Sequence, residues 1–151
     1  VQLVPGVKGK GVLIPVDGSE YSLRGVSLVI SRRSRYANPE DVQIHLVNVQ
    51  APFPHFASSF ASREQVAGFH EEESREQLRE ACRLLDSAGV RYTCHYKVGD
   101  AAEVITALAD KLTCDEIVMG AHGRSAVADA IVGSVSRKVV HLSKIPVLLI
   151  K

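Results

Sequence analysis

Short apolar runs alternate with longer amphipathic stretches along the chain, and this alternation restricts the fold more than any other feature of the sequence. The pattern is typical of βαβ units, in which strands pair in a parallel sheet and helices cover its faces. Apolar or alternating runs predict five strands, over residues 11–16, 42–49, 90–98, 117–119 and 146–150. Amphipathic stretches predict four helices, over about residues 19–32, 62–88, 100–112 and 134–143.

The polarity of each strand predicts its place in the sheet. The runs 11–16 and 117–119 are almost wholly apolar, as strands covered on both faces should be, whereas the run 90–98 alternates apolar with polar residues and suits an edge. We therefore expect a single doubly wound open α/β sheet, Rossmann-like or flavodoxin-like, with five mainly parallel strands in the order 3-2-1-4-5. The length of 151 residues fits one domain, over residues 1–151.

The composition excludes several classes of function. With 18 Lys and Arg against 17 Asp and Glu, the formal charge is +1, which argues against partners such as nucleic acid or an anionic membrane. The three cysteines are too far apart for zinc-ligand pairs, and we expect free, small core residues in a reducing cytoplasm. No apolar run is long enough for a membrane span, and no signal pattern is visible. Positions suggest neither a metal site nor a catalytic triad or dyad.

In the strand order 3-2-1-4-5, a ligand crevice opens where the first and fourth strands end. Glycines gather after the fourth strand, at Gly120, Gly123 and Gly133, and Ser134 then begins a helix. Glycines let a backbone approach a ligand closely, and the N–H groups of a helix N-terminus attract anions, so this pattern predicts a phosphate site. It is neither a Walker A loop nor a GxGxxG turn, so the backbone and the hydroxyls of Ser134 and Ser136 would hold the phosphates.

Three other residues near this crevice have two interpretations each. Asp17 ends the first strand, where its carboxylate could accept hydrogen bonds from a ribose, or could close an Asx turn or cap before the first helix. His122 and Arg124 lie within the glycine stretch, where they could contact phosphate or simply face solvent.

The spacing Gly120-x2-Gly123-x9-Gly133-Ser134 resembles the ATP-binding signature of the universal stress protein family, and Val16-Asp17-Gly18-Ser19-Glu20 resembles that family's first strand-to-helix turn. The likeness covers essentially the whole chain, including the closing run 146–150. Every signature position is filled, which places the chain in the ATP-binding branch. Two features depart from the family pattern: Pro15 stands where many relatives carry alanine, and the Phe-rich loop 51–61 is individual to this chain.

The resemblance implies an ATP site, loaded with Mg²⁺. Asp17 would contact the ribose, the backbone of Val49 would contact the adenine, and Pro15 would line the same pocket. Two segments would wrap the phosphates, the first with Gly120, His122, Gly123, Arg124 and Ser125 and the second with Gly133, Ser134, Val135 and Ser136.

The resemblance favours a cytoplasmic regulatory protein, in which bound ATP shapes a surface for an unknown protein partner and turnover is slow or incidental. One alternative is an enzyme on the same fold that hydrolyses ATP or transfers its adenylyl group, for which the glycine stretch offers Asp129. Another is a dimeric interaction module with an empty pocket. The fifth strand predicts a homodimer, because Val147–Ile150 is an apolar edge with no charge before Lys151.

Overall fold

Five parallel strands form one sheet in the order β3-β2-β1-β4-β5. The computed structural model describes residues 10–54, 59–124 and 132–151. The strands are β1 (Gly11–Pro15), β2 (Gln43–Gln50), β3 (Thr93–Val98), β4 (Glu116–Gly120) and β5 (Val147–Ile150). The predicted α/β class and strand order are confirmed, and every pair of neighbouring strands is parallel.

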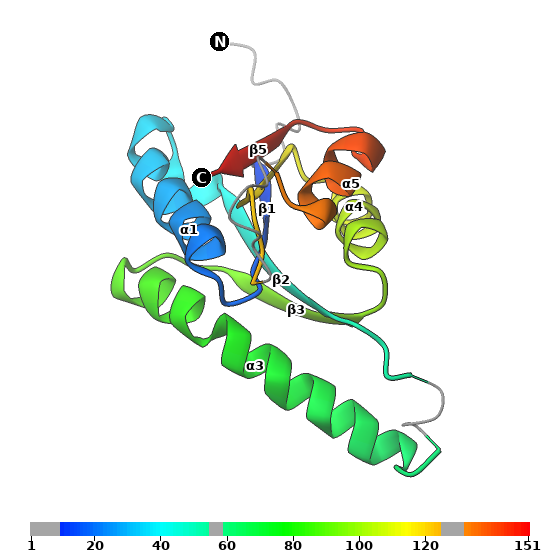
Figure 1. Cartoon of the computed structure of the whole chain (residues 1–151). Coiled ribbons are helices and arrows are strands. Elements are labelled where there is room, and N and C mark those ends of the chain that lie inside the picture. The colour runs from blue at the N-terminus through cyan, green and yellow to red at the C-terminus, as the bar shows by residue number, and fades with distance from the viewer. Residues whose placement is uncertain (1–9, 55–58, 125–131) are drawn as a thin grey trace.

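Helices cover both faces of the sheet (Figure 1). They are α1 (Glu20–Arg32), α3 (Arg63–Ser87), α4 (Ala101–Lys111) and α5 (Ser134–Leu142), with short 3-10 turns at Arg33–Arg35 and Pro39–Asp41. The helix α1 packs beside α3 on one face, and α4 packs beside α5 on the other. The N-termini form where polar caps stand in the sequence: Ser19 and Asp100 each accept one backbone N–H, and Ser62 forms a capping box with Gln65.

The hydrophobic core has two halves, one on each face of the sheet. Val12 and Ile14 of β1 pack toward α3 residues such as Leu85, whereas Leu13 between them packs toward α4 residues such as Ile105. These three β1 side chains are at most 1% exposed, as the apolar run in the sequence predicts for a central strand. Because β1 and β4 are parallel neighbours, their carboxyl ends, at Pro15 and Gly120, lie side by side at one end of the sheet.

The third strand begins later than the sequence pattern suggests, at Thr93 rather than residue 90. Gly89 adopts φ +64° after α3, and its N–H donates to the carbonyl of Asp86. The N–H of Val90 donates to Leu85, which completes a Schellman motif. The N–H of Val90 is therefore used at the end of α3, and pairing of β3 with β2 begins only three residues later, at Thr93.

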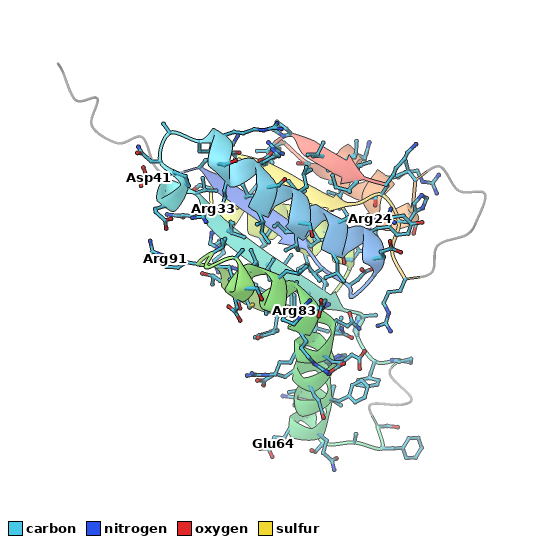
Figure 2. All side chains as sticks on the ribbon, turned by 90° about the vertical axis from the view of Figure 1, so that its left-hand side faces the viewer. Arg24, Arg33, Asp41, Glu64, Arg83 and Arg91 are labelled. Carbon is cyan, nitrogen blue, oxygen red and sulfur yellow. The ribbon has the colours of Figure 1, made fainter. Side chains whose placement is uncertain are left out.

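The helix α3 extends well beyond the sheet. Its 25 residues span about 38 Å, and in Figure 2 the end near Glu64 stands clear of the strands while Arg83 lies beside them. Phe53, from the Phe-rich loop after β2, packs on Phe69 and His70 of this projecting half, with ring centroids 5.3 and 4.8 Å away. Among the described residues, no helix combines the length and apolar character needed to cross a bilayer.

Candidate functional site

A pocket of about 470 Å³ opens where β1, β2 and β4 end, between α4 and the start of α5. Its volume lies within the range of small-molecule and cofactor sites. Ten of the twelve residues predicted for the site line it: Pro15, Asp17, Val49, Gly120, His122, Gly123, Gly133, Ser134, Val135 and Ser136. Arg124 is absent from that lining, and Ser125 lies outside the described residues.

Asp17 holds the turn after β1 against the segment after β4. Its Oδ1 accepts the N–H of Ser19 at 3.0 Å, which forms the Asx turn that the sequence offered as one interpretation. Its Oδ2 accepts the N–H of Arg124 at 3.1 Å. The carboxylate is thus positioned by two backbone donors at the wall of the pocket, and each oxygen retains a lone pair for a further donor.

The glycines let this segment lie close to its neighbours. A Cβ at Gly123 would lie 2.8 Å from Oδ2 of Asp17, and a Cβ at Gly120 would lie 2.7 Å from Cβ of Tyr21. Gly123 therefore leaves room for the Asp17 carboxylate, and Gly120 leaves room for α1 to pack on β4. At Gly133, a Cβ would meet the carbonyl oxygen of Ala121 at 3.3 Å.

The helix α5 directs its N-terminus into the pocket. Gly133 is the N-cap and offers no side chain to the first turn, and the first helical hydrogen bond runs from Arg137 N–H to the Gly133 carbonyl at 3.0 Å. The N–H groups of Ser134, Val135 and Ser136 therefore have no acceptor among the described residues. These donors and the positive end of the helix dipole form a site suited to an anion.

The two serines at this helix start differ in what they can offer. The hydroxyl of Ser136 is buried and donates to the carbonyl of Gly120 at 2.9 Å, which ties α5 to β4. Ser136 thus retains its oxygen lone pairs but has used its hydrogen. Ser134 is exposed at the rim, where its hydroxyl can turn toward a ligand.

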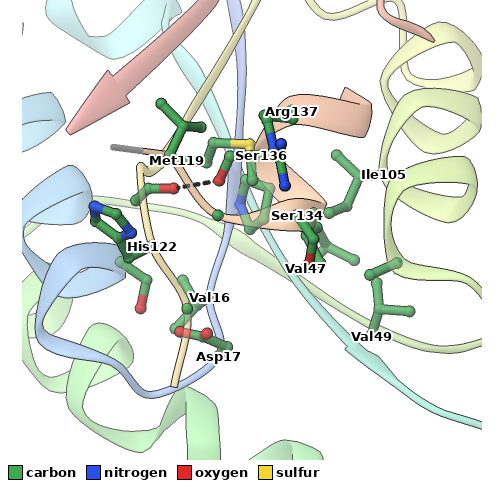
Figure 3. A pocket seen from close by; sticks show the side chains of 18 residues that line it. Val16, Asp17, Val47, Val49, Ile105, Met119, His122, Ser134, Ser136 and Arg137 are labelled. Carbon is green, nitrogen blue, oxygen red and sulfur yellow. Dashed lines mark hydrogen bonds between the residues drawn. The ribbon is translucent and has the colours of Figure 1, made fainter. Parts of the chain in front are cut away.

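Opposite the polar groups, the pocket has an apolar wall. Val47 and Val49 of β2 and Ile105 of α4 lie on one side of the cavity, and Asp17 and His122 lie on the other (Figure 3). The His122 ring packs on Tyr21 at a centroid distance of 5.2 Å, and its buried Nδ1 has no hydrogen-bond partner among the described residues. The pocket thus combines an apolar side with a polar side that suits an anion.

Arg124 and Lys138 are engaged outside the pocket. The guanidinium of Arg124 lies 3.6 Å from the Glu73 carboxylate of α3. The Lys138 ammonium lies 3.0 Å from Asp100 and 3.2 Å from Glu103, which joins α5 to the start of α4. The pKa of Asp100 is lowered, first by the Glu103 N–H that it accepts and then by Lys138, and the two carboxylates raise the pKa of Lys138.

The family follows from comparison with known proteins. A family model described as the universal stress protein family matches residues 10–151. The chain belongs to the universal stress protein family. The universal stress protein MJ0531 of Methanocaldococcus jannaschii is 30% identical to it over 142 residues, which are 94% of this chain and 82% of that protein.

Two solved structures show the same fold. The structure of MJ0577, from the same archaeon, matches this universal stress protein with a TM-score of 0.79 at 25% identity and covers 96% of this chain and 97% of that one. A universal stress protein from Archaeoglobus fulgidus, solved in complex with dAMP, matches with a TM-score of 0.65 at 21% identity. That match covers 96% of this chain and 100% of the other.

The structure of this universal stress protein adds pocket residues that sequence reasoning did not select. The apolar wall includes Val47, Ile105 and Met119, which the sequence pattern assigns to the core without indicating that they border a cavity. Arg137 also lines the pocket, and its guanidinium has no ion-pair partner among the described residues. Its place one turn into a helix that starts at a glycine was a usable signal, because that position carries a side chain back toward the N-terminus.

Proposed function

We propose that this universal stress protein binds ATP with Mg²⁺ in the pocket at the ends of β1 and β4. The observation that carries the proposal is the unpaired N-terminus of α5, which faces Asp17 across a cavity with an apolar wall. The dAMP complex of the Archaeoglobus fulgidus relative supports an adenine nucleotide, because that protein shares the fold.

The residues present fit the parts of a nucleotide. A purine suits the wall of Val47, Val49 and Ile105, and the Asp17 carboxylate has lone pairs for ribose hydroxyls. The free N–H groups at the start of α5 suit anionic oxygens. In bound ATP, the triphosphate oxygens would accept hydrogen bonds from these donors, and the purine would exclude water from the apolar wall.

Arg137 supplies the positive charge that this site needs. It lines the pocket, while its neighbour Lys138 is held by Asp100 and Glu103. Among the described residues, no group of three or more His, Cys, Asp or Glu could hold a metal. Mg²⁺ would therefore arrive with the nucleotide and be held chiefly by phosphate oxygens and water.

A regulatory role suits this chemistry better than catalysis. Hydrolysis needs a base directed at the phosphates, and Asp17 is the one carboxylate among the described pocket-lining residues. Asp129, the carboxylate that the glycine stretch offers for this role, lies outside the described residues. Both oxygens of Asp17 already accept backbone N–H groups, so it serves position rather than proton transfer. We propose that bound ATP orders the surface around Gly120–Arg124 and the start of α5 for a protein partner in the cytoplasm.

A homodimer through β5 is the second part of the proposal. The strand β5 is an edge of the sheet, paired only with β4 among the described strands, and Leu148 on it is 37% exposed. Antiparallel pairing with a second copy would satisfy its open backbone groups and close after two chains.

The direct test is to denature the purified protein and identify any released nucleotide by chromatography and mass spectrometry, followed by titration of the stripped protein with MgATP. A matched pair of variants then tests the site. Arg137→Gln should weaken MgATP by roughly 10-fold or more through loss of a charge-assisted hydrogen bond, while Lys138→Gln should leave affinity within about 2-fold. No released nucleotide, together with no binding of ATP, ADP or AMP, would refute the proposal.

A further inference from the structure

Two of the three cysteines meet in the folded chain. Cys82 lies on α3 and Cys94 on β3, and their Sγ atoms are 3.7 Å apart. Both thiols are free, and both residues are half-buried. The two cysteines are twelve positions apart in the sequence, and their contact arises because α3 packs along the edge strand that follows it.

The surroundings of the pair suit a thiol pair that reagents can reach. The strand β3 is the edge of the sheet beyond β2, no further strand pairs with it among the described residues, and most of its residues are exposed. Tyr92 and Tyr96 flank Cys94 at alternate positions, and the Tyr92 hydroxyl donates to Asp86 at 2.9 Å. Cys114, by contrast, is 6% exposed in the core beneath α4. Of the three cysteines, only Cys82 and Cys94 are both close to another thiol and partly exposed.

We propose that Cys82 and Cys94 form a reversible intramolecular disulfide when the protein meets a peroxide. A disulfide needs an S–S distance near 2.04 Å, so the sulfurs must approach by about 1.7 Å for the bond to form. The proposal goes beyond nucleotide binding and does not depend on it, because the pair lies outside the pocket lining.

The reaction balances with one equivalent of hydrogen peroxide. The Cys82 thiolate attacks one peroxide oxygen, an S–O bond forms, and the O–O bond breaks to release hydroxide, which takes a proton to become water. Cys94 then attacks the Cys82 sulfenic sulfur, the S–S bond forms, and the S–O bond breaks. The departing hydroxide takes the Cys94 proton. Two thiols are oxidised, and one peroxide is reduced to two waters.

The two cysteines react one after the other and have different roles. Burial raises the pKa of the Cys94 thiol to about 12, with a further contribution from neighbouring Cys82, so Cys94 stays protonated near neutral pH. A protonated thiol is a poor first nucleophile toward peroxide. Cys82 is therefore the residue that reacts first. Cys94, whose Sγ lies 3.7 Å from that of Cys82, then resolves the sulfenic acid.

The disulfide would fasten the C-terminal part of α3 to β3. The cross-link closes a short loop that contains the turn at Gly89 and removes conformations from the unfolded chain. By the usual scaling of such loops, oxidation should raise the melting temperature by roughly 5–10 °C. Reduction with dithiothreitol should return it to the starting value.

The test treats the full chain with hydrogen peroxide and counts thiols after denaturation. We expect the titre to fall from three to one, the mass to fall by two hydrogen atoms, and peptide mapping without reductant to join Cys82 to Cys94. Cys114→Ser should keep this cross-link. Cys94→Ser should instead leave a Cys82 sulfenic acid that dimedone traps, with no rise in melting temperature.

Three results would overturn the proposal. They are a full thiol titre after peroxide treatment, oxidation of the cysteines to sulfinic acid without a cross-link, and a cross-link between two chains instead of within one. The first two are measured on the unaltered protein, so a serine variant that folds poorly does not affect them.

Discussion

Gly123→Ala tests whether the Asp17 carboxylate is held in place for a ligand. The new Cβ would lie 2.8 Å from Oδ2 of Asp17, well inside the 3.5–4.0 Å at which non-bonded atoms attract. The carboxylate must therefore move by about 0.5 Å or more, away from the Arg124 N–H that it accepts at 3.1 Å. The same movement takes the carboxylate away from the ribose hydroxyl that it would accept from ATP. Such a hydrogen bond to a charged group contributes about 1.5–3 kcal/mol, so we expect a loss of about 2 kcal/mol in binding free energy for MgATP.

This loss can be read as a change in thermal stabilisation by ligand. At MgATP one hundred times the Kd of the parent protein, the parent gains about 2.7 kcal/mol of stability. A loss of about 2 kcal/mol raises Kd about 30-fold, so the same ligand concentration stabilises Gly123→Ala by only about 0.9 kcal/mol. The shift in melting temperature should drop from roughly 5–11 °C to roughly 2–3 °C. Differential scanning fluorimetry and calorimetric titration both measure this.

Gly68→Ala is the matched control. Gly68 lies inside α3, and none of the described residues outside its own helix turn lies within 4 Å of its missing Cβ, so the variant should gain up to about 1 kcal/mol from helix propensity and keep the full ligand shift. Asp17→Ala should reproduce the loss seen for Gly123→Ala. If Gly123→Ala folds and retains the ligand shift of the parent protein, Asp17 is a turn residue and the reasoning for the ribose contact is wrong.

Two other predictions address the sheet edges. Leu148→Lys should convert a β5-mediated dimer to monomer in sedimentation at micromolar concentration, because the charge sits on an exposed edge residue; a variant that stays dimeric would place the interface elsewhere. Between β2 and the edge strand β3, His45 Nδ1 and His95 Nε2 lie 3.2 Å apart. Burial lowers the pKa of both, and the positive charges of His45, Lys97 and Lys111 lower the pKa of His95 further. The folded state therefore binds fewer protons than the unfolded state, so stability is complete above about pH 6.5 and declines as pH falls below it. Denaturant unfolding from pH 7.5 to 5 should show this decline, and His95→Gln should flatten it; an equal slope in the variant would refute the assignment.

The sheet could be predicted because its signals are local. The apolar run 11–16 and the alternating run 90–98 differ in how many of their faces are covered, and that difference alone places the first strand inside and the third at an edge. Helix starts were equally visible at Ser19, Ser62 and Asp100, because a cap acts within three residues. Most strand boundaries moved by one residue, and the largest change, from residue 90 to Thr93, came where a local hydrogen bond of Val90 competed with the sheet.

The site could be predicted in its backbone but less well in its side chains. Glycine spacing located the polar side of the pocket, since close approach leaves a mark on residue type. The sequence does not indicate in the same way which residues the charged side chains contact. Arg124 turns to Glu73 on a helix some fifty residues away, and Arg137 faces the pocket while Lys138 does not. The meeting of Cys82 with Cys94 depends in the same way on how α3 lies along β3.

The length of α3 divides the helix into two parts with different local stability. Leu78, Ala81 and Leu85 anchor the part beside the sheet, whereas the first turns bury little besides His70 and carry Gly68 within them. The projecting part can therefore fray without disturbing the sheet, and its amide protons exchange through local opening rather than global unfolding. A protease would meet this end of the helix first, and an insertion there would cost the fold least.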